Sequence, residues 1–235
     1  MLNVLDGLMN FRISDTFTDS LTKLNNDEQK AVKTSAFDLQ LNPANPGMQF
    51  HKLEKAKDPN FWSVRVNRDI RLIVHKNQES LMLCYVGHHD DAYRWAEKRK
   101  LETHPKTGAA QLVEIRETVE EITIPKYIDV KQQPVTKPFL FENLSDDELL
   151  NYGVPAEWLD DVHKVNEDTV LDLAGHLPGE AAEALLNLAV GIKPQPSTMP
   201  FACENPFDHP DAKRCFRVIN NTEELAKALD YPWEK

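Results

Sequence analysis

The residues best suited to chemistry lie in one short segment, FWSVRVNRDIRLIVHKNQESLMLCYVGHHDDAYRWA, at positions 61–96. It contains Arg71 in an apolar run and ends with His88, His89 and Tyr93. Phosphodiester chemistry needs a group that can give or take a proton and a cation for the charge on the phosphate. Histidine titrates near neutral pH, and arginine offers phosphate a bidentate donor. These four residues are therefore the candidate catalytic group for phosphodiester chemistry.

Basic residues are concentrated around the same segment. The dense cluster consists of Lys52, Lys55, Lys57, Arg65, Arg68 and Arg71. Residues 1–105 hold fifteen Lys or Arg against fourteen Asp or Glu, a balance of +1, whereas residues 106–235 hold twelve against twenty-four, a balance of −12. An acidic region repels phosphate, so nucleic-acid binding must come from the first part of the chain. We expect Lys52, Lys55, Arg65 and Arg68 to bind nucleic acid.

The hydrophobic pattern predicts strands that would position these side chains. Apolar and polar residues alternate over 62–66 and again over 70–75, as in strands with one buried face. Residues 67–69 form the turn between them, and the almost wholly apolar run 81–86 is typical of a central strand covered on both faces. An antiparallel meander is predicted, with the Arg, His and Tyr residues near strand ends.

Helical spacing surrounds the meander. A short strand is predicted at 11–13, helices at 16–24 and 26–41 with a cap at 25–27, and a final helix at 90–101. The order of elements is strand, helix, helix, three strands, helix. The fold class is therefore α+β, an antiparallel sheet with helices packed on it.

With these features, residues 9–102 resemble the RelE/ParE family of toxin domains. The resemblance rests on the element order, on WSVRVNRDIRLIV with its two arginines, and on the Val-Gly-His-His-Asp-Asp-x-Tyr ending. It implies a ribosome-dependent endoribonuclease fold in which basic residues hold mRNA phosphates. Arg71 matches the strand arginine of the family, His88 or His89 the terminal Arg or His, and Tyr93 the tyrosine that follows.

A non-catalytic interpretation of the same residues stays open. The domain is near neutral, whereas members that cut mRNA are generally strongly basic, and Asp90 and Asp91 lie beside the candidate site. In this alternative, Arg65 and Arg71 pair with Asp69 or Asp90, the two histidines cap the last helix with Asp90, and Tyr93 packs in the fold.

Beyond residue 105 the composition predicts three further parts. Residues 106–141 form a linker with a β-rich piece, residues 142–192 a small all-α module, and residues 193–235 an extended segment with a short C-terminal helix. In the helical module, Ser145 to Glu148 reads as a capped helix start.

A second resemblance lies in this half. FENLSDDELLNYGVPAEWLDDV, LPGEAAEALLNLAVG and FRVINNTEELAKALDYPWEK are similar to the region that precedes the motor of bacterial UvrD-type DNA helicases carrying a RelE-like domain. The chain lacks a G-x-x-x-x-G-K-[ST] phosphate loop, so we expect no ATP binding through such a loop and no unwinding by this chain. A fragment of a longer helicase and a stand-alone relative both fit.

Two functions follow. The first is a non-motor, RelE-like region of a UvrD-type helicase, associated with DNA repair, that docks nucleic acid, a helicase motor or another protein. The alternative is an active toxin of the toxin–antitoxin kind, cutting RNA on the ribosome and restrained by its own acidic helical segment.

Cysteine spacing and hydropathy predict the cellular compartment of the protein and whether it binds metals or membranes. Cys84, Cys203 and Cys215 lack metal-ligand spacing, and Cys84 lies in an apolar run, so we expect a buried thiol and no disulfide, zinc or cofactor. No apolar stretch approaches the roughly 18 residues that span a bilayer, and the first ten residues lack a secretion signal. A cytoplasmic protein without a membrane partner is predicted.

Overall fold

The chain forms two compact units in a computed structural model that describes residues 9–42, 49–116, 137–195 and 205–230. The first unit combines residues 1–99 with residues 213–235, and the second consists of residues 100–212. The first unit therefore joins two segments that are far apart in the sequence.

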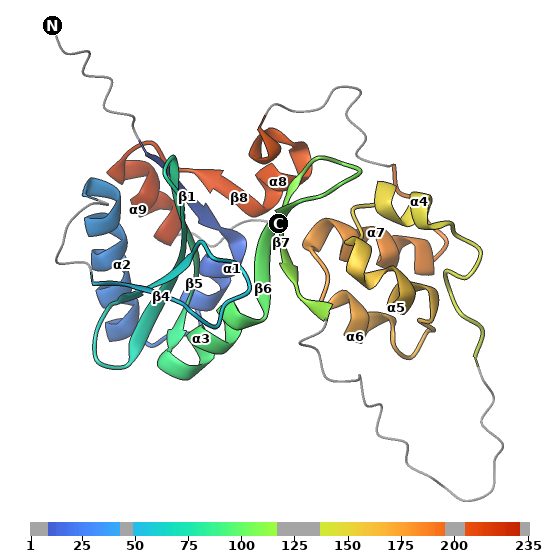
Figure 1. The fold of residues 1–235 in the computed structure, drawn as a ribbon, viewed down its shortest axis with the longest axis horizontal. Helices are drawn as coiled ribbons and strands as arrows, with labels where there is room; N and C mark the ends of the chain where they lie inside the picture. The colour runs from blue at the N-terminus through green and yellow to red at the C-terminus, as the bar shows by residue number, and fades with distance from the viewer. Residues whose placement is uncertain (1–8, 43–48, 117–136, 196–204, 231–235) are drawn as a thin grey trace, which may run out of the picture. The chain divides into compact units, whose positions relative to one another are not determined.

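The first unit is built on a six-stranded sheet in the order β2-β3-β4-β5-β1-β8 (Figure 1). Its strands from β2 to β5 are antiparallel neighbours, β1 runs parallel to β5, and β8 is antiparallel to β1. The strands are β1 (Asn10–Ser14), β2 (Phe50–Lys52), β3 (Phe61–Arg65), β4 (Ile70–Lys76), β5 (Ser80–His88) and β8 (Phe216–Val218).

The strands predicted over 11–13, 62–66, 70–75 and 81–86 are confirmed as β1, β3, β4 and β5. Alternate residues of β3 and β4, such as Val64 and Leu72, are buried in one core cluster. The apolar strand β5 lies between β4 and β1, which explains why almost every residue in it is buried. The predicted antiparallel meander is therefore present.

Helices cover the sheet on both faces. The core cluster joins the sheet to α1 (Asp15–Leu21), α2 (Asn26–Leu41) and α9 (Thr222–Asp230). Strand residues of the opposite alternation contact α3 (His89–Glu97), where the Trp95 ring stacks on Tyr85 at 4.9 Å. The fold class of the unit is α+β, as predicted from the element order.

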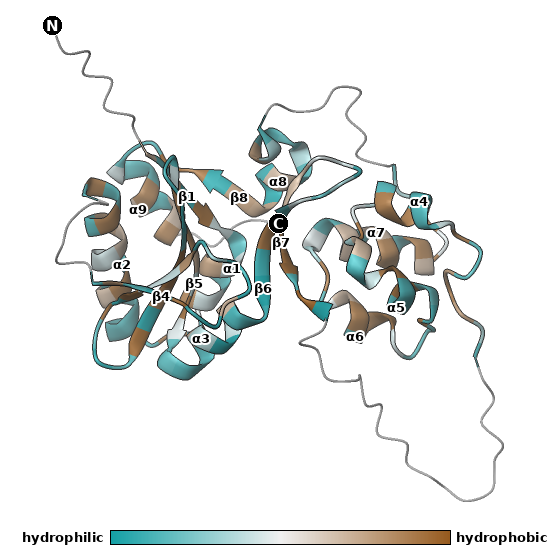
Figure 2. Ribbon diagram, in the orientation of Figure 1, coloured by the Kyte–Doolittle hydropathy of each residue, from teal (hydrophilic) through white to brown (hydrophobic). Residues whose placement is uncertain are grey.

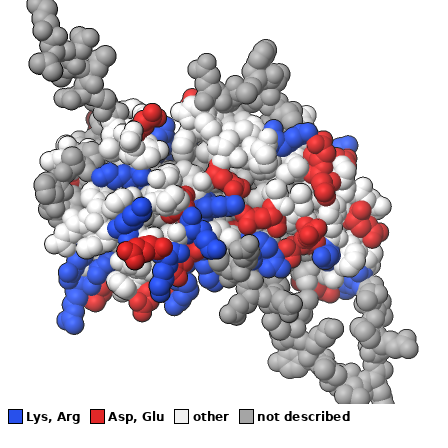
Figure 3. Space-filling model, viewed as in Figure 1, with Lys and Arg blue, Asp and Glu red and all other residues white. Residues whose placement is uncertain are grey.

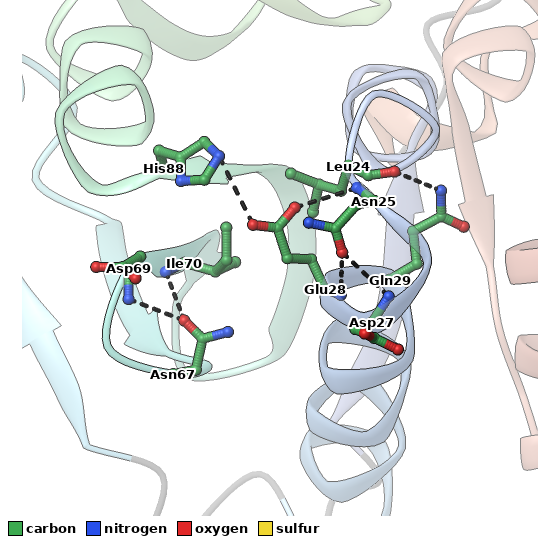
Figure 4. Close-up of polar contacts among 9 residues, drawn as sticks. All are labelled: Leu24, Asn25, Asp27, Glu28, Gln29, Asn67, Asp69, Ile70 and His88. Carbon is green, nitrogen blue, oxygen red and sulfur yellow. Dashed lines mark hydrogen bonds and ion pairs between the residues drawn. The ribbon is translucent and has the colours of Figure 1, made fainter.

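Local capping signals in the sequence are also confirmed. Asn25 is the N-cap of α2, its side chain accepts from the Glu28 backbone N–H, and the Glu28 carboxylate accepts from the Asn25 N–H (Figure 4). This reciprocal capping box satisfies two backbone donors that would otherwise lack partners. It fixes where α2 begins.

The predicted final helix over 90–101 is wrong at its end. Helix α3 stops at Glu97, and Arg99–Thr103 forms β6, which pairs with β7 (Ala110–Glu114) in a two-stranded sheet. The charged run after Glu97 has no apolar face that would hold a further helical turn against the sheet. Pairing with β7 supplies backbone partners in place of that turn.

The second unit holds a helical core beside β6 and β7. Trp158 is fully buried among Val113, Leu149 and Leu185, and its indole N–H donates to the Glu114 carbonyl at 2.9 Å. The predicted capped start is confirmed, because Ser145 and Glu148 form a capping box. Its helices are α4 (Asp146–Asn151), α5 (Leu159–His163), α6 (Val170–Ala174) and α7 (Gly179–Ala189), with 3-10 turns at Ala156–Trp158 and Pro206–Asp208. The residues of α8 (Pro210–Cys215) are divided between the two units.

The predicted four-part division of the chain stays a prediction. Strand β8 and helix α9, which fall in its last part, pack with the first unit, where Lys33 forms an ion pair with Asp230. Of the β-rich piece predicted over residues 112–128, residues 117–128 lie outside the described residues. No helix in the described ranges is long and apolar enough to cross a bilayer.

The two units differ in charge. The first has 19 Lys or Arg against 17 Asp or Glu, a formal +2, and the second has 8 against 21, a formal −13. On the first unit, the visible face carries many blue cationic side chains with red acidic ones among them (Figure 3). Helix α3 is coloured mostly as hydrophilic (Figure 2). Cationic side chains for an anionic ligand are therefore more plentiful on the first unit.

One buried histidine makes the second unit sensitive to pH. His104 is fully buried; its Nδ1 accepts from the Lys106 and Thr107 N–H groups, and its Nε2 contacts the Val154 carbonyl at 2.9 Å. Burial lowers the pKa of His104 below the ordinary value of 6.5. The His104 imidazole therefore takes up a proton more readily in the unfolded chain than in the folded one. The contribution of the neutral ring to folding stability is fully present above about pH 6.5, and it is lost as the pH falls towards the folded-state pKa.

We expect a lower urea midpoint for the second unit at about pH 5.5 than at about pH 7.5. His104→Asn should reduce this difference, because the titrating ring is gone, although it lowers stability at both pH values. His51→Asn, a change at an exposed histidine of β2, is the matched control and should leave the difference intact. An undiminished pH effect in His104→Asn would contradict the assignment.

Candidate functional site

The first unit contains a cleft between one side of α3 and the segment formed by the last residue of β2 and the four residues after it. Its volume is about 530 Å³, within the usual range for small-molecule sites. One wall is residues 52–56, which we call the lysine segment, and the other is α3. The lining residues are Lys52, Leu53, Glu54, Lys55, Ala56, His89, Asp90, Tyr93, Arg94 and Glu97.

Helix α3 positions the imidazole and phenol of the cleft. It begins directly after β5, and the His89 N–H donates to the Asp69 carbonyl at 2.9 Å. His89 and Tyr93 are four residues apart, on one side of the helix, and their rings stack with centroids 4.3 Å apart. The Tyr93 hydroxyl hydrogen bonds with the Ser63 hydroxyl of β3 at 3.1 Å. The sheet therefore holds this ring pair in place.

The lysine segment carries cations that the described protein does not neutralise. Leu53 is buried, and its N–H donates to the Phe61 carbonyl at 3.3 Å, which ties the segment to β3. The side chains of Lys52, Lys55 and Glu54 are exposed and have no hydrogen-bond or ion-pair partner among the residues that the structure describes. They are available to a ligand.

The charges in the cleft are balanced. Asp90 contacts His89 Nδ1 at 2.8 Å, and this hydrogen bond lowers the pKa of the Asp90 carboxyl. Arg94 pairs loosely with Asp91 at 3.3 Å, with both side chains more than half exposed. Three cationic and three anionic side chains line the ligand space, together with the His89 imidazole. The cleft can bind phosphate through its lysines and N–H donors through its carboxylates.

The structure brings together four of the eight predicted site residues: Lys52, Lys55, His89 and Tyr93 line the cleft. Arg65 and Arg71 do not line the cleft, because both hydrogen bond to the backbone of the turn between β3 and β4. Arg65 Nε donates to the Asn67 carbonyl at 3.1 Å, and an Arg71 guanidinium nitrogen donates to the same carbonyl at 3.0 Å. Arg68 lies in that turn, at residues 67–69, and also outside the cleft lining.

The two adjacent histidines diverge. His88 Nε2 lies 3.7 Å from Glu28 Oε1 of α2, outside the cleft lining (Figure 4). His88 is the N-cap of α3, but its side chain makes no capping hydrogen bond. Only His89 of the pair faces the ring of Tyr93 and the ligand space. The predicted choice between His88 and His89 therefore narrows to His89 for this cleft.

Sequence reasoning missed Glu54, Arg94 and Glu97 as lining residues. The spacing held a signal for two of them, because Arg94 follows Asp90 by four residues and Glu97 follows Tyr93 by four. Cys84 was predicted as a buried thiol, and this is confirmed: it is fully buried, and burial strongly raises the pKa of the Cys84 thiol. Within the described ranges, no three His, Cys, Asp or Glu residues are grouped to hold a metal ion.

No model of a protein family matches the chain, and a search of curated proteins finds no match.

We predict that His89→Ala weakens the binding of inorganic pyrophosphate to the cleft by roughly fivefold, the equivalent of one hydrogen bond of about 1 kcal/mol. His88→Ala is the matched control and should bind normally, because its ring faces Glu28. The measurement is the shift of backbone amide NMR signals of residues 52–56 and 89–94 on titration. Equal effects of the two changes, or shifts confined to residues 65–71, would contradict the location of the site.

Proposed function

We propose that the first unit docks single-stranded nucleic acid in the cleft. The observation that carries the proposal is that the lysines of the lysine segment, which have no partner among the described residues, line the same cleft as the stacked rings of His89 and Tyr93. Single-stranded nucleic acids are bound by this combination of cations for phosphates and aromatic faces for bases.

The charge of the cleft argues for docking of modest strength. Three carboxylates oppose part of the attraction of Lys52, Lys55 and Arg94 for phosphate, so few phosphates can be neutralised at once. A flipped or single-stranded nucleotide matches a space of about 530 Å³ and offers N–H donors to the carboxylates. Duplex recognition would require a longer basic surface.

We also propose that this unit is RelE-like and belongs to the non-motor part of a UvrD-type helicase in the cytoplasm. The support is the order of β1, α1, α2 and the meander, together with the helicase-like sequence patterns in residues 141–191 and 216–235. The last of these patterns ends in residues 231–235, outside the described residues. In such a protein, docking would hold a single strand near the motor.

Endoribonuclease activity is the second candidate. It is favoured by the half-exposed His89, beside Tyr93 and in the same cleft as Glu54 and Glu97, two carboxylates with no partner in the described ranges. A carboxylate could accept the proton of the 2′-hydroxyl, His89 could protonate the leaving oxygen, and a lysine could stabilise the phosphorane. Arg71 would have to leave the turn carbonyls to take part. The acidic helical segment over residues 142–192 would then be the proposed restraint.

The docking proposal predicts a change in salt dependence. Each lysine–phosphate contact to a single strand contributes about 0.7 to the slope of log affinity against log salt, so Lys52→Ala/Lys55→Ala should lower the slope by about 1.4. The measurement is fluorescence anisotropy with a labelled RNA of about ten nucleotides. The matched control is Lys23→Ala/Lys30→Ala. It removes two exposed lysines outside the cleft, one just after α1 and one in α2, and should change the slope little. Equal slopes for all three proteins would refute docking at the cleft.

The enzyme candidate predicts cleavage of mRNA by the purified chain on translating ribosomes, detected by primer extension. His89→Ala should abolish the cut and Arg71→Ala should leave most of it, because only His89 lines the cleft. Intact mRNA at high protein concentration would remove this candidate and leave docking. Cleavage that is lost only in Arg71→Ala would place the chemistry elsewhere.

A further inference from the structure

A carboxylate and an imidazole are buried together near the lysine segment, and neither lines the cleft. Asp58 Oδ2 lies 3.4 Å from His75 Nε2, and the Asp58 and His75 side chains are 6% and 7% exposed. Withdrawing two such groups from water costs free energy that good geometry only partly returns. The hydrogen bonds of Asp58 and the ring contacts of His75 indicate the role of the pair.

Asp58 closes the loop that contains the lysine segment. Its Oδ1 accepts from the Asn60 N–H at 2.9 Å, and its main-chain carbonyl accepts from the Phe61 N–H at 3.3 Å. At the same end of the loop, the Lys76 N–H donates to the Asn60 carbonyl at 2.9 Å, and at the other end the Leu53 N–H donates to the Phe61 carbonyl at 3.3 Å. The loop is therefore fastened to β3 and β4 on the side of Asp58.

His75 connects this fastening to the opposite wall of the cleft. It lies on β4, and its ring meets the Phe61 ring edge to face with centroids 5.7 Å apart. Phe61 in turn packs on Trp95 of α3 at 5.9 Å. A continuous series of contacts thus runs from Asp58 through His75 and Phe61 to the helix that carries His89 and Tyr93.

We propose that the buried pair of Asp58 and His75 positions the lysine segment opposite α3, so that Lys52 and Lys55 can reach the phosphate of a strand bound beside the His89–Tyr93 ring pair. Neither Asp58 nor His75 touches the ligand; both are positioning residues. The proposal rests on the docking function proposed for the cleft. It adds that the affinity for a nucleic-acid strand depends on the buried contact between Asp58 and His75 as well as on the two lysines.

The test compares RNA binding by variants of the full chain at a temperature where each is folded. Asp58→Ala removes the acceptor for Asn60 and the partner of His75, and should lower the affinity and the salt slope as much as Lys52→Ala/Lys55→Ala does. Combining the three changes should add little further loss, because all act through the same two cations. Asp58→Asn keeps an oxygen for Asn60 and offers an amide to His75, and should restore most of the binding.

A matched control separates positioning from general stability. Ser20→Ala removes the hydroxyl that accepts from the Val86 N–H at 3.0 Å, a buried hydrogen bond that reaches β5 rather than the loop. It should lower the urea midpoint and leave the RNA affinity and salt slope unchanged. A merely structural Asp58 would behave like Ser20.

A second readout follows the loop directly, should Asp58→Ala not fold. In His75→Asn, the shorter side chain loses Asp58, and trypsin should cleave faster after Lys52 and Lys55 but not after Lys23. Unchanged cleavage after Lys52 and Lys55 would overturn the positioning role. Equal RNA binding by folded Asp58→Ala and the unaltered chain would overturn this role alone, whereas absence of RNA binding by the unaltered chain would overturn the docking function and this role with it.

Discussion

The arrangement of the first unit depends on the position of β5 between β4 and β1. Because it is paired on both edges and covered on both faces, its side chains are apolar over nearly its whole length. Its last residue pairs with Ile70, and the chain then turns directly into α3. The register of one buried strand therefore determines where His89 and Tyr93 lie, and a shift of one residue would exchange the roles of His88 and His89.

Features that depend on neighbouring residues could be predicted from the sequence, whereas contacts between distant residues could not. The strand over 62–66 and the caps at Asn25 and Ser145 depend on neighbours within a few residues, and the structure has them as expected. The single buried face predicted for that strand is wrong, because Ser63 is buried as well as Val64. The pairing of β8 with β1 joins residues about two hundred positions apart, and three residues carry no pattern that specifies such a partner.

The candidate site divides in the same way. His89 and Tyr93 share a helical side, so their spacing was informative, but the direction of Arg71 depends on carbonyls of a turn that the sequence does not specify in detail. Residue type alone gives an arginine equal reasons to bind a phosphate or to brace a turn. The choice between these roles follows from which acceptor lies nearer in the folded chain.

Strand β8, which completes the first sheet, is synthesised about two hundred residues after β1, the strand with which it pairs. Until Phe216–Val218 leave the ribosome, β1 has an unpaired edge, and the core lacks Ile219, Leu225 and Leu229. The residues of the second unit are made before that point and can fold first. The nascent chain therefore carries an incomplete first unit for more than a hundred residues of elongation, a window in which chaperones have an exposed strand edge to protect.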